Sequence, residues 1–73
     1  MNTELIKEIN EVLEFDITKI DKSKELIELG IDSMKLVQTI GIIEQHYNVT
    51  LEMEKFYNMT VNDFLKIVEN KKH

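Results

Sequence analysis

Cysteine and proline are absent from this chain of 73 residues, and glycine occurs only at Gly30 and Gly41. Without cysteine the chain can form neither a disulfide nor a zinc site with thiolate ligands, and it has no thiol nucleophile. Sandwiches and barrels of β-strands need many tight turns, which are rich in glycine and proline. The sequence therefore predicts an all-α protein.

Arginine is also absent, and nine lysines stand against fourteen acidic residues, which gives a net charge of −5. A chain of this charge repels phosphate backbones, and no local basic stripe compensates, so we expect no nucleic-acid partner. No apolar run is long enough to span a membrane, and the first residues, MNTELIKEI, lack the apolar core of a signal peptide. We expect a cytoplasmic protein with no membrane partner.

The length allows one small domain over residues 1–73, in which 42% hydrophobic residues can build a single core. Apolar side chains recur at the spacing of a helix face in residues 4–14, 33–47 and 61–70. Residues 53–58 should add one or two helical turns. The predicted fold is a four-helix bundle with a short third helix and a long first loop, and we expect a monomer.

Helix starts are marked by capping residues. Asp32 is a good N-cap for the second long helix, and Gly30 permits a sharp entry into it. Thr60 followed three residues later by Asp63 resembles the capping pattern of a hydroxyl and an acid. These signals place helix starts at Ser33 and after Thr60.

Residues 15–32 show no sustained helical period, and a structureless loop of this length is unusual in a compact domain. We expect a short helical turn within residues 23–29, with Ser23 as a possible cap. Several apolar side chains can attach the loop to the core, namely Phe15, Ile17, Ile20, Leu26 and Leu29.

The second long helix has two contrasting faces. At 100° per residue, a buried stripe forms with Val37 on its flank, and it consists of Leu36, Ile40, Ile43 and Tyr47. The opposite stripe consists of Met34, Gln38, Gly41, Ile42 and Gln45. This second stripe carries no charge, although 32% of the residues in the chain are charged.

Catalysis by the chain itself is not expected. His46 and His73 are too few for a metal cluster, and the chain has no glycine-rich phosphate loop. Ser33 and His46 cannot act as nucleophile and base, because thirteen residues along one helix separate them by about 20 Å. We therefore predict no catalytic residue and no metal site.

Two interpretations of Asp32 and Ser33 are open from these residues alone. Both can be ordinary cap residues. Alternatively, a phosphodiester on the Ser33 hydroxyl would be stabilised by the free N–H groups and the dipole at the helix start. Ser33 has no base of its own, so another enzyme would have to activate it.

The wider pattern resembles the acyl and peptidyl carrier-protein family, whose serine receives phosphopantetheine. The resemblance covers nearly the whole chain, including the long first loop and the register of the second helix, and it implies a four-helix bundle of the carrier-protein type. Its motifs are Ile20-Asp21, Leu26, Leu29-Gly30, Asp32-Ser33-Met34, and Phe56-Tyr57-Asn58-Met59-Thr60-Val61. The last motif departs from the family at Met59, where proline is usual.

This resemblance implies that Ser33 is the attachment site of a covalent phosphopantetheine arm derived from coenzyme A. Asp32 would help to position the serine and the incoming coenzyme A, and Met34 would pack beside the arm. The chain would be a carrier rather than an enzyme. Its partners would be a phosphopantetheinyl transferase, a ligase or transferase that loads acyl or aminoacyl groups, and downstream synthase or tailoring enzymes.

The kind of carrier is indicated by a departure from the family. Fatty-acid carriers usually present acids along the second helix, whereas this helix has Lys35, Gln38, Ile42 and Gln45. The sequence favours a freestanding carrier of a peptide or polyketide pathway. A carrier of fatty acid synthesis, a D-alanyl carrier and an unmodified helical adaptor are the alternatives. We predict a partner surface formed by Met34, Lys35, Gln38, Gly41, Ile42 and Gln45.

Overall fold

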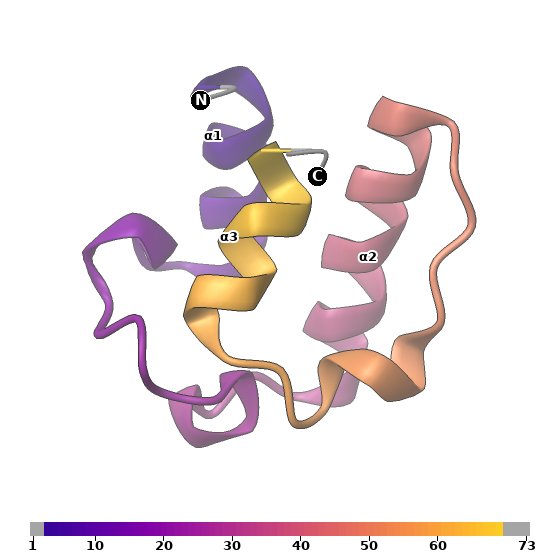
Figure 1. Ribbon diagram of the computed structural model, residues 1–73. Coiled ribbons are helices and arrows are strands. Elements are labelled where there is room, and N and C mark those ends of the chain that lie inside the picture. Colours follow the sequence, from indigo (N-terminus) through magenta and orange to yellow (C-terminus); the bar gives the residue numbers. More distant parts are fainter. Residues whose placement is uncertain (1–2, 70–73) are drawn as a thin grey trace.

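The computed structural model describes residues 3–69, and Figure 1 shows their arrangement. They form three α-helices and three short 3₁₀ helices. These are α1 (Thr3–Leu13), η1 (Ile17–Lys19), η2 (Leu26–Leu29), α2 (Ser33–Tyr47), η3 (Met53–Phe56) and α3 (Val61–Glu69). No strand occurs within residues 3–69, so the predicted all-α class is confirmed.

One hydrophobic core is shared by all three α-helices. In Figure 1, α2 and α3 run in the direction opposite to that of α1. Buried side chains come from α1 (Leu5, Ile6, Ile9, Leu13), α2 (Leu36, Ile40, Ile43), α3 (Val61, Phe64, Leu65, Val68) and the 3₁₀ helices (Ile17, Leu26, Phe56). Ile40 and Ile43 therefore point inward as predicted. The core also contains one polar residue that the periodicity did not predict, Thr39, which is 1% exposed.

The end of the first predicted helix differs slightly from expectation, and the end of the last one is not tested. The first helix was expected to reach residue 14, but α1 ends at Leu13 because Glu14 adopts a left-handed conformation with φ of 68°. The last helix was expected to reach residue 70, which lies outside the described residues, as does His73. No helix of residues 3–69 is both long enough and apolar enough to cross a membrane.

The expected short third helix is shorter and tighter than predicted. Instead of helical turns over residues 53–58, the structure has the 3₁₀ helix η3 over Met53–Phe56. Short 3₁₀ segments are common as connectors between helices. Phe56 is buried and meets Phe64 of α3 edge to face, with 6.2 Å between ring centroids, whereas Met53 is only half-buried. The predicted four-helix bundle is therefore confirmed only in part: residues 3–69 contain three α-helices, and a 3₁₀ helix stands where the short third helix was expected.

The long first loop contains η1 and η2, and the expected cap at Ser23 is wrong. The Oδ1 atom of Asp21 instead accepts hydrogen bonds from the backbone N–H and the hydroxyl of Ser23, at 2.9 and 2.7 Å. Glu25 is the N-cap of η2, and its N–H donates to Oε1 of Glu28 at 3.0 Å. Because η2 begins at Leu26, its cap is Glu25, and Ser23 lies before the capping position.

The first loop is attached to the segment that precedes α3. Backbone N–H groups of Leu26, Val61 and Asn62 donate to the carbonyls of Met59, Lys24 and Lys22, at 2.9, 2.8 and 3.0 Å. These hydrogen bonds hold η2 beside the chain that follows η3. As a result, η2, η3 and the start of α2 gather at the end of the molecule opposite the N-terminus (Figure 1).

Candidate functional site

Ser33 is the first residue of α2, and Asp32 caps this helix as predicted. The Oδ1 atom of Asp32 accepts the backbone N–H of Lys35 at 2.8 Å, and its carbonyl accepts that of Leu36 at 3.0 Å. This arrangement satisfies donors that the start of a helix otherwise leaves free. The position of Ser33 is therefore determined by hydrogen bonds within its own helix turn.

Gly30 makes the entry into this turn possible. It ends η2 with φ of 75°, a left-handed conformation that L side chains disfavour. A Cβ at this position would meet no atom within 4 Å. The backbone conformation, and not a lack of space, is therefore the reason for glycine here.

The Ser33 side chain is exposed, and its hydroxyl has no hydrogen-bond partner within residues 3–69. It lies where the free N–H groups and the dipole of α2 stabilise a negative group. His46 is thirteen residues further along the same helix, about 20 Å away, and cannot serve as its base. The hydroxyl is thus accessible to an external enzyme and suited to hold a phosphodiester.

Lys35 does not extend into solvent beside Ser33. Its Nζ pairs with Oε2 of Glu14 at 3.1 Å, and its side chain is 34% exposed. Thr39 lies one turn after Lys35 on the same helix face and is buried. The buried stripe of α2 therefore extends on the flank that carries Thr39, and Val37, on the opposite flank, is 51% exposed.

The residues predicted to form the partner surface do not all face outward. Met34 is 71% exposed, and Gln38 and Gln45 are exposed as well. Gly41 and Ile42 are both half-buried, and Ile42 packs against the core. The outward part of the stripe is therefore the side of α2 that carries Met34, Gln38 and Gln45.

A small apolar pocket of about 110 Å³ lies beside the start of α2, and the sequence did not predict it. Its lining residues are Leu26, Ile27, Ile31, Leu36, Phe56 and Tyr57. They come from η2, the short link before α2, α2 itself and the chain around η3, and the backbone hydrogen bonds of the first loop hold η2 beside the chain that follows η3. No helical periodicity could have placed Ile27 and Tyr57 at one pocket, because one belongs to η2 and the other follows η3.

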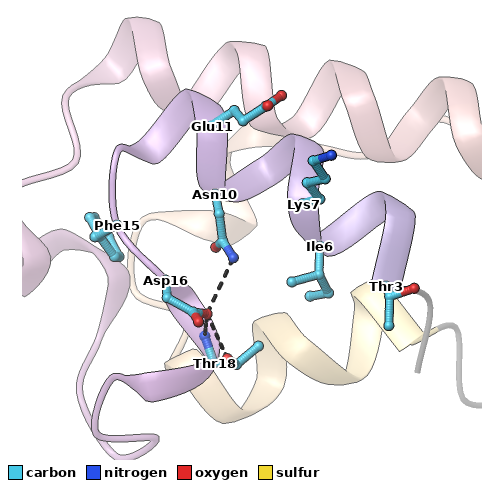
Figure 2. Close-up of a pocket in the computed structure, with 8 residues that line it drawn as sticks. All are labelled: Thr3, Ile6, Lys7, Asn10, Glu11, Phe15, Asp16 and Thr18. Carbon is cyan, nitrogen blue, oxygen red and sulfur yellow. Dashed lines mark hydrogen bonds between the residues drawn. The ribbon is translucent and has the colours of Figure 1, made fainter.

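A second, wider hollow of about 580 Å³ lies between α1 and η1 (Figure 2). The carboxylate of Asp16 lies at its edge and accepts hydrogen bonds from Asn10 Nδ2 at 3.2 Å and from the Thr18 N–H and hydroxyl at 3.0 and 2.6 Å. These bonds, above all that of the Thr18 hydroxyl, lower the pKa of Asp16. The Asp16 carboxylate at this hollow attaches η1 to α1, so its role is structural. No cluster of metal-ligating side chains occurs among the described residues.

Comparison with known proteins identifies the family. Residues 3–68 match a family model described as a phosphopantetheine attachment site. The chain is 33% identical over 64 residues to probable polyketide synthase 41 of Dictyostelium discoideum, a match that covers 85% of this chain and 2% of the synthase. It is 30% identical over 64 residues to probable polyketide synthase 40 of the same organism, with the same coverage.

Another relative is much shorter than the synthases and about as long as this chain. The acyl carrier protein homolog of Mycoplasmopsis pulmonis is 35% identical over 54 residues, which are 73% of this chain and 74% of the relative. No solved structure matches the chain. The family model covers nearly all of the described residues. The chain therefore belongs to the family of phosphopantetheine-binding carrier domains, which hold this group covalently and are carriers, not enzymes.

Proposed function

We propose that Ser33 bears the phosphopantetheine arm and that this chain delivers acyl or aminoacyl groups to partner enzymes. The observation that carries the assignment is the exposed Ser33 hydroxyl at the first residue of α2, without a partner among residues 3–69. The arm supplies a thiol on which such groups are held as thioesters. The open first turn of α2 stabilises the phosphodiester that joins the arm to the serine.

Asp32 and Met34 have different roles at this serine. Asp32 caps α2 through one carboxylate oxygen and so orients Ser33 for the transferase and for coenzyme A. Met34, 71% exposed, offers an apolar side chain beside the arm. Asp32 serves as the helix cap and His46 lies about 20 Å away, so we assign removal of the Ser33 hydroxyl proton to a phosphopantetheinyl transferase.

The pathway we propose is of the peptide or polyketide type. Similarity to segments of two polyketide synthases supports this pathway. The outer face of α2 supports it as well, because its exposed residues Met34, Gln38 and Gln45 are not acidic. A carrier of fatty acid synthesis is the second candidate, favoured by the similarity to an acyl carrier protein homolog along most of its length. Loading enzymes and later synthase or tailoring enzymes are the corresponding partners.

The test is the intact mass after incubation with coenzyme A and a broad-specificity phosphopantetheinyl transferase. The wild-type chain should gain the mass of one phosphopantetheinyl group, and Ser33→Ala should gain none while keeping a helical circular dichroism spectrum. Ser23→Ala changes the one other serine of the chain and is the matched control, which should be modified like wild type. Modification of Ser33→Ala would refute the site, and an unmodified wild type would indicate a helical adaptor.

A further inference from the structure

We propose that Glu28 is a positioning residue for transfer of the arm: its carboxylate fixes η2, and η2 in turn sets how Ser33 is presented to the transferase. The proposal rests on the assignment of Ser33 as the attachment site. Glu28 is exposed, and no hydrogen bond joins it to Ser33 within residues 3–69. Its action therefore runs through the backbone between the two residues.

The Glu28 carboxylate holds the point at which the first loop meets the segment before α3. Its Oε1 atom accepts the backbone N–H of Glu25 at 3.0 Å, as the third residue of a capping box does for the N-cap. Glu25 is the N-cap of η2 and forms an isolated antiparallel bridge with Thr60. The next residue, Leu26, donates its N–H to the carbonyl of Met59 at 2.9 Å. The carboxylate thus restrains the start of η2 at its junction with the rest of the chain.

Residues 30–32 connect η2 to Ser33, and the first of them does not restrict its own backbone. Gly30 has φ of 75°, and without a Cβ it can reach many other conformations at little cost. Its N–H donates to the carbonyl of Ile27 at 3.4 Å, which is long for a hydrogen bond. The conformation of Gly30 therefore depends on how firmly η2 is held. A change in η2 is passed on to Asp32, which caps α2.

The two sides of η2 are held in different ways. Leu26 is buried and Leu29 is half-buried against the core, so packing holds the inner side. Ile27 and Glu28 are exposed on the outer side. Apolar packing is not directional, whereas a hydrogen bond requires a particular distance and angle. Glu28 therefore supplies a directional restraint that the packed leucines do not.

Loss of this hydrogen bond should lower kcat and leave KM nearly unchanged. Part of the Glu28→Ala molecules would present the Ser33 hydroxyl in the wrong direction, and these would bind the transferase without reacting. Since a net hydrogen bond shifts a local equilibrium by about fivefold, Glu28→Ala should lower kcat about two- to fivefold. A substitution that only removed a charge from a docking surface would instead raise KM.

A conservative variant and a matched control test the role of Glu28. Initial rates of arm transfer from coenzyme A are measured by intact mass over a range of carrier concentrations, with circular dichroism as the folding control. Glu28→Gln keeps an oxygen acceptor without the charge and should retain the wild-type kcat. Glu54 is also exposed in the first turn of a 3₁₀ helix, but its carboxylate has no partner within residues 3–69. Glu54→Ala should therefore behave like wild type.

Amide hydrogen exchange at Glu25 provides a readout that does not depend on the transferase. Exchange should be faster in Glu28→Ala than in wild type and should return to the wild-type rate in Glu28→Gln, because the oxygen acceptor is restored. A Glu28→Gln variant as slow in arm transfer as Glu28→Ala would show that the charge is needed, which would overturn the positioning role. A wild-type kcat in Glu28→Ala, or an equal loss in Glu54→Ala, would overturn it as well. In each of these cases Ser33 still gains the arm, whereas a wild type that gains none would refute the proposed function itself.

Discussion

The two glycines of the chain differ in backbone conformation, although both have free space around them. Gly30 has φ of 75°, whereas Gly41 lies within α2, and a Cβ at either position would meet no atom within 4 Å. Steric crowding is therefore absent at both sites. The effect of adding a methyl group depends only on backbone conformation and on the freedom of the unfolded chain.

Alanine substitutions should consequently change stability in opposite directions. Gly30→Ala should lower the free energy of unfolding by about 1–2 kcal/mol, because a left-handed residue with a Cβ is strained. Gly41→Ala should raise it by about 0.4–1 kcal/mol, as expected for an alanine in a helix. Urea denaturation of both variants checks the prediction. Stabilisation by Gly30→Ala would show that the left-handed conformation at Gly30 is misassigned.

At the scale of elements, the junction between α1 and η1 depends on a carboxylate. Asp16 accepts hydrogen bonds from Asn10 and Thr18, and the Asn10 side chain accepts the N–H of Ile17 at 2.9 Å. These bonds hold the pKa of Asp16 below its ordinary value of 3.8. The folded state therefore favours the charged form, which stabilises the fold above that value and is lost as the pH falls through the lowered pKa.

Replacing this carboxylate should make the stability less sensitive to acid. The melting temperature of Asp16→Asn should lie below that of wild type at neutral pH, and the difference should shrink as the pH falls to about 3. Glu8→Gln on the exposed face of α1 is the control and should follow wild type throughout. Thermal unfolding followed by circular dichroism across this range is the measurement. A difference that stays constant with pH would contradict the role assigned to the Asp16 charge.

At the scale of the whole molecule, all three helices depend on one small core. Ile43 is 1% exposed within this core, and truncation of such a side chain typically costs about 2–5 kcal/mol. Domains of this size have only a few kcal/mol of stability. Ile43→Ala should therefore unfold partly at room temperature, as measured by urea denaturation and circular dichroism. Ile27→Ala removes the same atoms from a side chain that is 56% exposed and should change the stability little. Equal stability of the two variants would contradict the assigned core.

Local features of this fold could be predicted from the sequence. The periodic apolar residues of α1, α2 and α3 determine where these helices lie, because a helix face is built from neighbours three and four residues apart. The caps at Asp32 and Thr60 follow from hydrogen bonds over three residues, to the N–H groups of Lys35 at 2.8 Å and Asp63 at 3.1 Å. The Ser33 hydroxyl at a helix start was predictable for the same reason.

Contacts between distant residues were decided only by the tertiary structure. The first loop follows its path because Lys22, Lys24 and Leu26 pair with residues 59–62, and this pairing brings Ile27 and Tyr57 to one pocket near the start of α2. The ion pair between Lys35 and Glu14 likewise joins residues 21 positions apart. Neither contact leaves a periodic signal, because its partner becomes a neighbour only when the core closes. The sequence by itself therefore determined the helices and the exposed serine, and the packing of the core decided which side chains line the pocket near the start of α2.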